Sequence, residues 1–220
     1  MENIKKKFRD LIVGGLSTIY DSSDEYKAAI IKIDYAAMDF LESAIRSCRI
    51  RDTFEMIYSP THIFDVSAES EKTQSDFTFG FSEYDMSFFF SMSIKNPLYI
   101  KNLQDQFIID FFKICNEYNV EYKSDHNETS GRSIFNKSIK SNIFRLFRNY
   151  TSDMLSEDGF NVYDNTLLGY FEKTWKYDSG NMDIDKIYND ISVLTKYFYK
   201  FNYHLWKAKC DDIKRSSFKS

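Results

Sequence analysis

Four adjacent residues, Asp125 to Glu128, combine two carboxylates with the imidazole of His126. Groups of these types hold a divalent cation or activate water in enzymes that hydrolyse phosphodiesters. Side chains so close along one loop rarely converge on a single ion, and no third ligand motif accompanies them. We therefore interpret the segment as a solvated loop. A small metal-dependent nuclease or nucleic-acid-processing enzyme is the alternative function.

A basic segment follows directly, because Thr129–Ser152 carries five cations and no Asp or Glu in a protein of net charge −4. At about 100° per residue its apolar side chains fall in one stripe, opposite most of the cations, which predicts an amphipathic helix. Its polar face could neutralise nucleic-acid phosphates along residues 131–152, contact an acidic protein surface, or be solvated. The five cations are Arg132, Lys137, Lys140, Arg145 and Arg148.

One further carboxylate, Asp34, falls inside the apolar arc of a helix predicted between Ser22 and Cys48. Burying a lone carboxylate is costly, so Asp34 must pair with Lys or Arg, accept hydrogen bonds, or face a cavity. Buried charged groups of this kind are sometimes catalytic. We favour a structural ion pair and keep Asp34 as a weak catalytic candidate beside Asp125, His126 and Glu128.

The C-terminal segment, residues 181–216, predicts a long helix with two apolar surfaces. A heptad stripe runs from Ile184 to Ala208 with spacings of three and four residues. Beside it an aromatic shoulder widens the apolar surface, so the helix is either central in the domain or meets a partner chain. The shoulder consists of Tyr188, Tyr199, Tyr203 and Trp206.

Composition bounds the class of protein. The 220 residues are 43% hydrophobic and 28% charged, as in soluble globular proteins, with 21 Phe and 16 Tyr but only 7 Gly and 2 Pro. Three widely spaced cysteines predict reduced thiols in the cytoplasm and no zinc site. The apolar run from Leu11 to Leu16 is too short for a membrane span, so we expect no membrane association. No nucleotide-binding, hydrolase or zinc-protease motif occurs, so we expect no cofactor or metal.

Alternation of apolar residues predicts a hairpin with strands at 77–81 and 84–94. A two-residue loop would set Phe79 opposite Met86 and Phe77 opposite Phe88, although Ser82-Glu83 is a poor turn pair and the loop could be longer. Residues 53–58 and 61–66 could add one or two strands. Between them and the hairpin, Ser67–Asp76 is polar, and we expect a mobile loop there.

Helices are expected over most of the remaining chain. The predicted ranges are 4–20, 22–48, 97–119, a basic helix after 130, 165–177 and 181–216. The fold expectation is therefore α+β and predominantly helical: a helical layer with a small antiparallel hairpin or meander inserted around residues 53–94, in a single domain 1–220.

The function expected from these features is that of a non-enzymatic interaction or accessory subunit. Its aromatic C-terminal helix would bind a partner protein or a second copy of the chain. Its basic helix would meet an anionic partner, either an acidic protein surface or nucleic acid.

Overall fold

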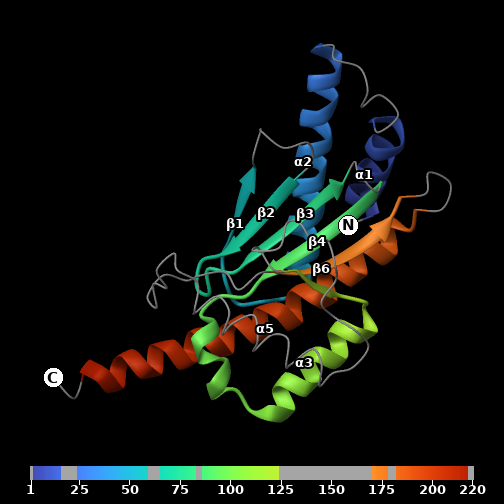
Figure 1. Ribbon diagram of the computed structural model, residues 1–220. Coiled ribbons are helices and arrows are strands. Elements are labelled where there is room, and N and C mark those ends of the chain that lie inside the picture. Colours follow the sequence, from blue (N-terminus) through green and yellow to red (C-terminus); the bar gives the residue numbers. More distant parts are fainter. Residues whose placement is uncertain are drawn as a thin grey trace, which may run out of the picture. The chain divides into compact units, whose positions relative to one another are not determined.

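The computed structural model describes residues 2–15, 24–58, 65–82, 86–123, 170–177 and 182–217. The strands form one six-stranded sheet in the order β1-β2-β3-β4-β6-β5 (Figure 1). In chain order the elements are α1 (Glu2–Gly15), α2 (Asp24–Ser47), β1 (Phe54–Tyr58), β2 (Asp65–Ser70), β3 (Asp76–Ser82), β4 (Ser87–Ser93), the 3-10 helix η2 (Pro97–Asn102), α3 (Asp105–Glu117), β5 (Glu121–Lys123), β6 (Tyr170–Lys176) and α5 (Ile184–Ser217).

The expected fold class is wrong in the size and extent of its β structure. The sheet is not a small insertion at 53–94, because β5 and β6 come from residues far outside that range. The fold is mixed α+β with a large sheet. β5 and β6 belong to the sheet because they form hydrogen bonds with strands that are distant in the sequence. A local pattern of side chains does not predict such pairing.

The chain divides into two compact units. The first takes its described residues from 1–71, 76–90 and 174–196, and the second from 72–75, 91–173 and 197–220. Both units therefore receive part of β4, part of β6 and part of α5.

In the first unit, α1 and α2 lie side by side, and α2 packs across β1, β2 and β3 (Figure 1). The core is built from aromatic rings: Phe8 of α1 stacks on Phe40 of α2 at 4.6 Å, and Phe40 stacks on Phe79 of β3 at 5.6 Å. All three side chains are fully buried. The apolar side chains of both helices recur with the helical period and thus face the sheet. Their burial there stabilises the two segments as helices.

The hairpin of β3 and β4 is confirmed, with a longer loop than the two-residue one. The ring of Phe79 stacks on Phe88 at 6.0 Å, and that of Phe77 on Phe90 at 6.3 Å. Phe88 also lies 5.4 Å from Phe81, so the rings of the two strands interleave on one face. The loop is longer because β3 ends at Ser82 and β4 begins at Ser87. The predicted alternation of buried phenylalanines is confirmed, since Phe77, Phe79, Phe81, Phe88 and Phe90 are all buried.

Residues 67–76 are not a mobile loop, because β2 occupies 65–70. The strand pairs antiparallel with β1 on one side and β3 on the other, with Ala68 opposite both Met56 and Phe77. Val66, Ala68 and Ser70 alternate as buried residues. Small and polar side chains have little intrinsic strand preference, and the two neighbouring strands override it.

The predicted helix 97–119 is interrupted. η2 ends at Asn102, and α3 begins at Asp105 after Gln104, whose backbone is extended at φ −70° and ψ 141°. Asn96 does not act as the expected side-chain cap, because its backbone is left-handed at φ 55°. Pro at the first position of η2 was the correct signal for a helical start, but the first turns remain a separate 3-10 segment.

The predicted helix 165–177 is wrong over its described part, since 170–176 form strand β6. β6 pairs antiparallel with β5, with Phe171 opposite Tyr122. The strand is rich in aromatic residues and Thr, which favour a pleated surface. Trp175 donates a hydrogen bond from its indole nitrogen to the Asp190 carboxylate of α5, 3.0 Å away.

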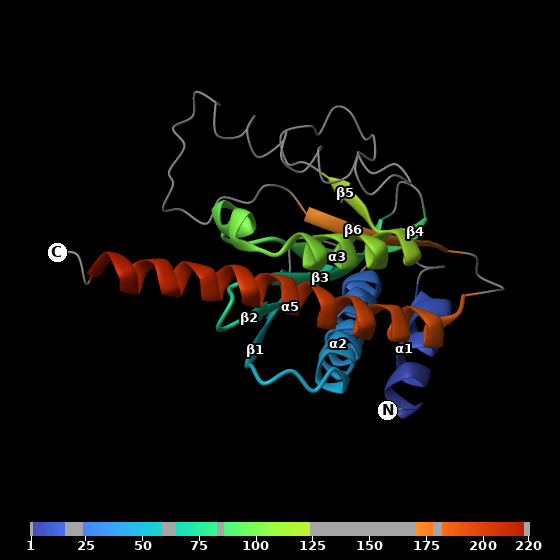
Figure 2. The same cartoon turned by 90° about the horizontal axis from the view of Figure 1, so that it is seen from below.

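The second unit packs α3 against the later part of α5 (Figure 2). Phe111 of α3 lies 4.8 Å from Phe198 and 4.2 Å from Phe201, measured between ring centroids. Asn202 of α5 is buried; its side-chain amide donates to the Ser93 carbonyl at 2.9 Å and accepts from the Lys95 amide at 2.9 Å. The rotation of α5 about its own axis is therefore fixed within this unit.

Replacing Phe40 with Ala should lower the free energy of unfolding by about 3–5 kcal/mol, because it empties the centre of a ring stack. Ile31→Ala on the same helix is the matched control, since Ile31 is 46% exposed and its truncation should change stability by no more than about 0.5 kcal/mol. Urea denaturation measures both. Equal effects of the two substitutions would contradict the packing described for α2.

Candidate functional site

Two groups of the residues that the sequence singled out fall within 124–169, outside the described residues. They are the loop candidates Asp125, His126 and Glu128, and the basic segment with Arg132, Lys137, Lys140, Arg145 and Arg148. They remain predictions from the sequence. The candidates that the structure does place are Asp34 and the aromatic shoulder of α5.

Asp34 is 1% exposed on α2, as its place in the apolar arc predicted. Its carboxylate lies near the Tyr58 hydroxyl of β1. Burial, together with the charge of Asp34, raises the pKa of Tyr58 above its usual value. The ring of Tyr58 also stacks on that of Tyr35 at 6.0 Å. The Asp34 carboxylate thus lies close enough to the Tyr58 hydroxyl for its charge to favour the neutral phenol.

Within the described ranges, no three His, Cys, Asp or Glu side chains come close enough together to hold a metal ion. Asp34 therefore gathers no second and third ligand from the described residues. A hydrolytic site needs convergent groups in a cleft. Asp34 supplies at most one of them.

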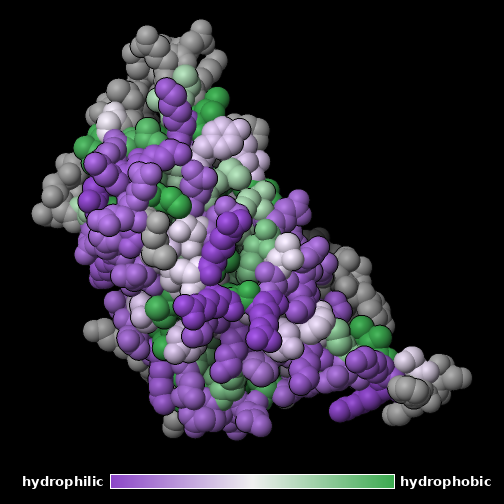
Figure 3. All heavy atoms as spheres, turned by 180° about the vertical axis from the view of Figure 1, so that it is seen from behind, coloured by the Kyte–Doolittle hydropathy of each residue, from purple (hydrophilic) through white to green (hydrophobic). Residues whose placement is uncertain are grey.

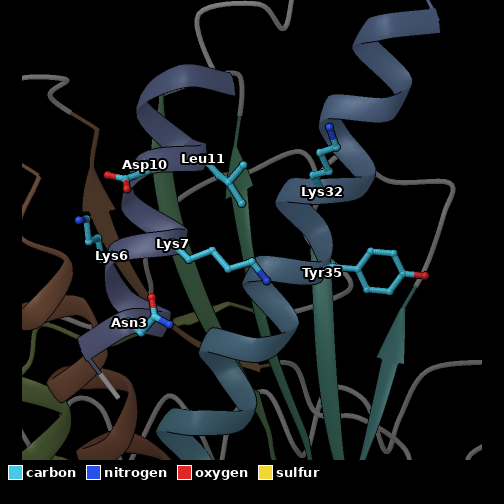
Figure 4. A pocket seen from close by; sticks show the side chains of 7 residues that line it. All are labelled: Asn3, Lys6, Lys7, Asp10, Leu11, Lys32 and Tyr35. Carbon is cyan, nitrogen blue, oxygen red and sulfur yellow. The ribbon is translucent and has the colours of Figure 1, made fainter.

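A groove of about 520 Å³ lies along α1 and α2 in the first unit (Figure 4). Lys7 extends across it from α1, and its ammonium pairs with Asp39 at 3.1 Å. Lys6 and Asp10 point away from α2, and Tyr35 points away from α1. The polar groups of this groove do not converge on one point, so the groove has no evident catalytic arrangement.

The heptad stripe of the last helix is the buried face of α5, as predicted. Every member from Ile184 to Leu205 is 0–2% exposed, and Ala208 is half-buried. Tyr188 belongs to this interior rather than to a surface: it is 3% exposed, and its hydroxyl donates to the Ser43 carbonyl at 2.9 Å. As placed in the first unit, Tyr188 is a core residue, which leaves three members of the shoulder for contact with a partner.

A second apolar strip runs along the outer side of α5 in the second unit. Tyr199 lies 6.2 Å from Tyr203, and Tyr203 lies 5.5 Å from Trp206, with interplanar angles of 25° and 36°. All three are half-buried, as is Cys210, and Ile213 is 57% exposed. Together these residues form the outer strip: Tyr199, Tyr203, Trp206, Cys210 and Ile213.

The outer strip is bordered by positive charge. Lys200, Lys207 and Lys214 follow one edge at intervals of seven residues, and all three are exposed. On Tyr203 itself the ammonium of Lys72 lies 6.0 Å from the ring centroid. Figure 3 shows hydrophobic atoms beside strongly hydrophilic ones on the last turns of α5, at the lower right of that view.

His204 lies beside the outer strip, toward α3. Its ring centroid is 4.8 Å from that of Phe107 and 6.2 Å from that of Tyr203. Burial, followed by the positive charges of Lys200 and Lys207, lowers the pKa of His204. The imidazole is therefore neutral at pH 7 and acts as a packing group between two rings.

The three cysteines are free thiols in different surroundings. The Cys48 thiol donates to the carbonyls of Ala44 and Ser192 at 3.3 and 3.0 Å, and burial raises its pKa to about 11. Burial also raises the pKa of Cys115, which is fully buried. Cys210, in contrast, is half-buried within the outer strip.

Sequence reasoning identified the aromatic part of the outer strip but missed its continuation. Cys210 and Ile213 extend the same alternation of four and three residues, and the seven-residue repeat of lysines is visible beside it. These signals were readable from the sequence. The sequence alone does not say which face of α5 is buried, so these residues could not be assigned to an exposed surface.

Comparisons with models of protein families, with curated proteins and with solved structures gave no match. No helix in the described part of the chain has the length and apolar character that crossing a membrane requires.

The neutral His204 predicts a specific pH dependence. Because its pKa is lower in the folded protein than the value of about 6.5 in the unfolded chain, its contribution to stability is present above that value. The contribution is lost as the pH falls through the folded pKa. His204→Gln should therefore reduce the loss of stability between about pH 7 and pH 5, as measured by urea midpoints. Parallel curves for parent and variant would contradict this placement.

Thiol reactivity should follow burial. With an alkylating reagent at pH 7.5, we expect Cys210 to react first, while Cys48 and Cys115 react only as the protein unfolds, because thiolates are the reactive form. Mass spectrometry of tryptic peptides assigns each label. Fast labelling of Cys48 in the native protein would show that its thiol is not held as described.

Proposed function

We propose that the protein is a non-enzymatic interaction or accessory subunit, and that it binds a partner protein through the outer strip of α5. One observation carries the proposal. The outer strip continues beyond the buried stripe: Leu205 is fully buried, whereas Ile213, two turns later and roughly 80° around the helix, is 57% exposed. Tyr and Trp are favoured anchors of protein interfaces because they bury a large area with few rotatable bonds.

The expected function has a second part, which concerns the basic segment and the compartment. The basic segment of residues 131–152 would contact an anionic partner, an acidic protein surface or nucleic acid, through its five cations. Free thiols at all three cysteines favour a reducing compartment, and we propose the cytoplasm. The nuclease alternative has less support, because the described carboxylate candidate, Asp34, lies against Tyr58 rather than in a metal-binding cluster.

Substitution of Ile213 tests the proposal without disturbing the core. Tagged parent protein and Ile213→Glu are purified in parallel from the native cell, and complex size is measured by light scattering. The parent should carry a stoichiometric partner, which Ile213→Glu should lose, because a carboxylate in an apolar contact must be desolvated. Alkylation of Cys210 should also be slower in the complex than in the free protein.

Ile31→Glu is the matched control, since Ile31 is exposed on α2 and receives the same change of charge. It should retain the partner. The proposal is overturned if the parent is monomeric and carries no other chain, or if both substitutions leave the complex unchanged. Circular dichroism of each variant establishes that the helical content is preserved.

A further inference from the structure

The outer strip has the spacing of a coiled-coil seam. Its members follow one another at intervals of four, three, four and three residues. In heptad terms, Tyr203 and Cys210 take a positions, and Tyr199, Trp206 and Ile213 take d positions. A seam of this period matches a second helix lying nearly parallel to α5, because the side chains stay in contact along both helices.

The charge beside the seam selects the kind of helix. The lysine row occupies three successive e positions, Lys200, Lys207 and Lys214, and all are exposed. Charges at e and g positions determine which helices pair. The Lys200 ammonium lies 5.5 Å from the centroid of the Phe107 ring, so a partner that offers Asp or Glu at the facing positions would pair with Lys207 and Lys214.

A second copy of this chain does not provide those carboxylates. In an antiparallel pair the lysine row would face another lysine row. In a parallel pair it would face the g positions, which are Asn202, Lys209 and Ser216. The basic segment Thr129–Ser152 is an equally poor occupant, because it carries five cations and no acid. Like charges disfavour the antiparallel pair and the basic segment, and the parallel pair offers the lysine row no carboxylate.

The aromatic rings favour a helix over nucleic acid. Single-stranded nucleic acids use lysine-bordered aromatic residues whose ring faces are open to bases. Here the Tyr203 ring stacks on that of Tyr199 at an interplanar angle of 25°, Trp206 lies against it tilted by 36°, and Lys72 lies over the ring. Neighbouring side chains thus compete with a base for the face of the central ring. Ring edges, which carry positive partial charge, suit aliphatic side chains and carboxylates.

We propose that the partner docks on α5 as an acidic amphipathic helix, with apolar residues in the seam and carboxylates facing Lys207 and Lys214. This inference rests on the proposed function, and it names the chemistry of the partner. The contact extends over about three heptads, from Tyr199 to the end of α5.

A pair of synthetic peptides tests this with the full chain. Both are three-heptad helices with Leu at a and d positions; one carries Glu and the other Lys at e and g. The parent should bind the Glu peptide and not the Lys peptide, with affinity that falls as salt is raised. Lys207→Glu together with Lys214→Glu should weaken binding of the Glu peptide about tenfold and create binding of the Lys peptide. Calorimetry and Trp206 fluorescence measure both.

The control is Lys6→Glu with Lys32→Glu, an equal change of net charge on exposed lysines of α1 and α2. It should leave the peptide preference unchanged. If neither peptide binds while the cellular partner still depends on Ile213, the proposed function stands and the acidic helix is wrong. Binding of an oligothymidylate that the double reversal at 207 and 214 abolishes would assign the strip to nucleic acid instead. Self-association of the parent, lost in Ile213→Glu, would assign it to a second copy.

Discussion

Packing between phenylalanine rings is the interaction on which both units depend. In the first unit, the stack of Phe8, Phe40 and Phe79 joins both N-terminal helices to the sheet. In the second, Phe111 joins α3 to α5 through two ring contacts. Large rings bury much area per residue and prefer offset or edge-to-face geometry, so they fix orientation as well as supplying free energy. A chain with so few glycines and prolines can hold long, regular elements against such a core.

The orientation of α5 decides what the helix can offer to another molecule. Asn202 and Phe198 are fully buried on one side, and Phe107 covers His204 on another. These contacts leave Tyr203 and its neighbours along the remaining side, next to the exposed lysine row. A single helix thus combines a core stripe with an outer strip, which accounts for an apolar surface wider than one interface needs. The proposed interaction with a partner uses the apolar surface of α5 that the core does not cover.

Local signals predicted the elements whose burial pattern is regular. The structure confirms the predicted helices α1, α2 and α5 and the predicted strands β3 and β4. Their ends differ from the predicted ones by a few residues. The failures at β2 and β6 have different causes. The small and polar residues of β2 carry little strand preference of their own, and pairing with the adjacent strands β1 and β3 overrides it. β6 has residues that favour a strand, but it pairs with β5, which is distant in the sequence. Hydrogen bonding along the sheet decides such cases.

For the candidate site, the sequence by itself determined that α5 has two apolar surfaces, that Asp34 sits in an apolar arc, and that lysines recur every seven residues. Only the tertiary structure decided which surface is interior. It placed Tyr188 in the core and Tyr203 on the outer strip, although both are aromatic residues of one shoulder. The reason is physical: periodicity gives the angle between two side chains on a helix, but burial depends on which other elements pack there.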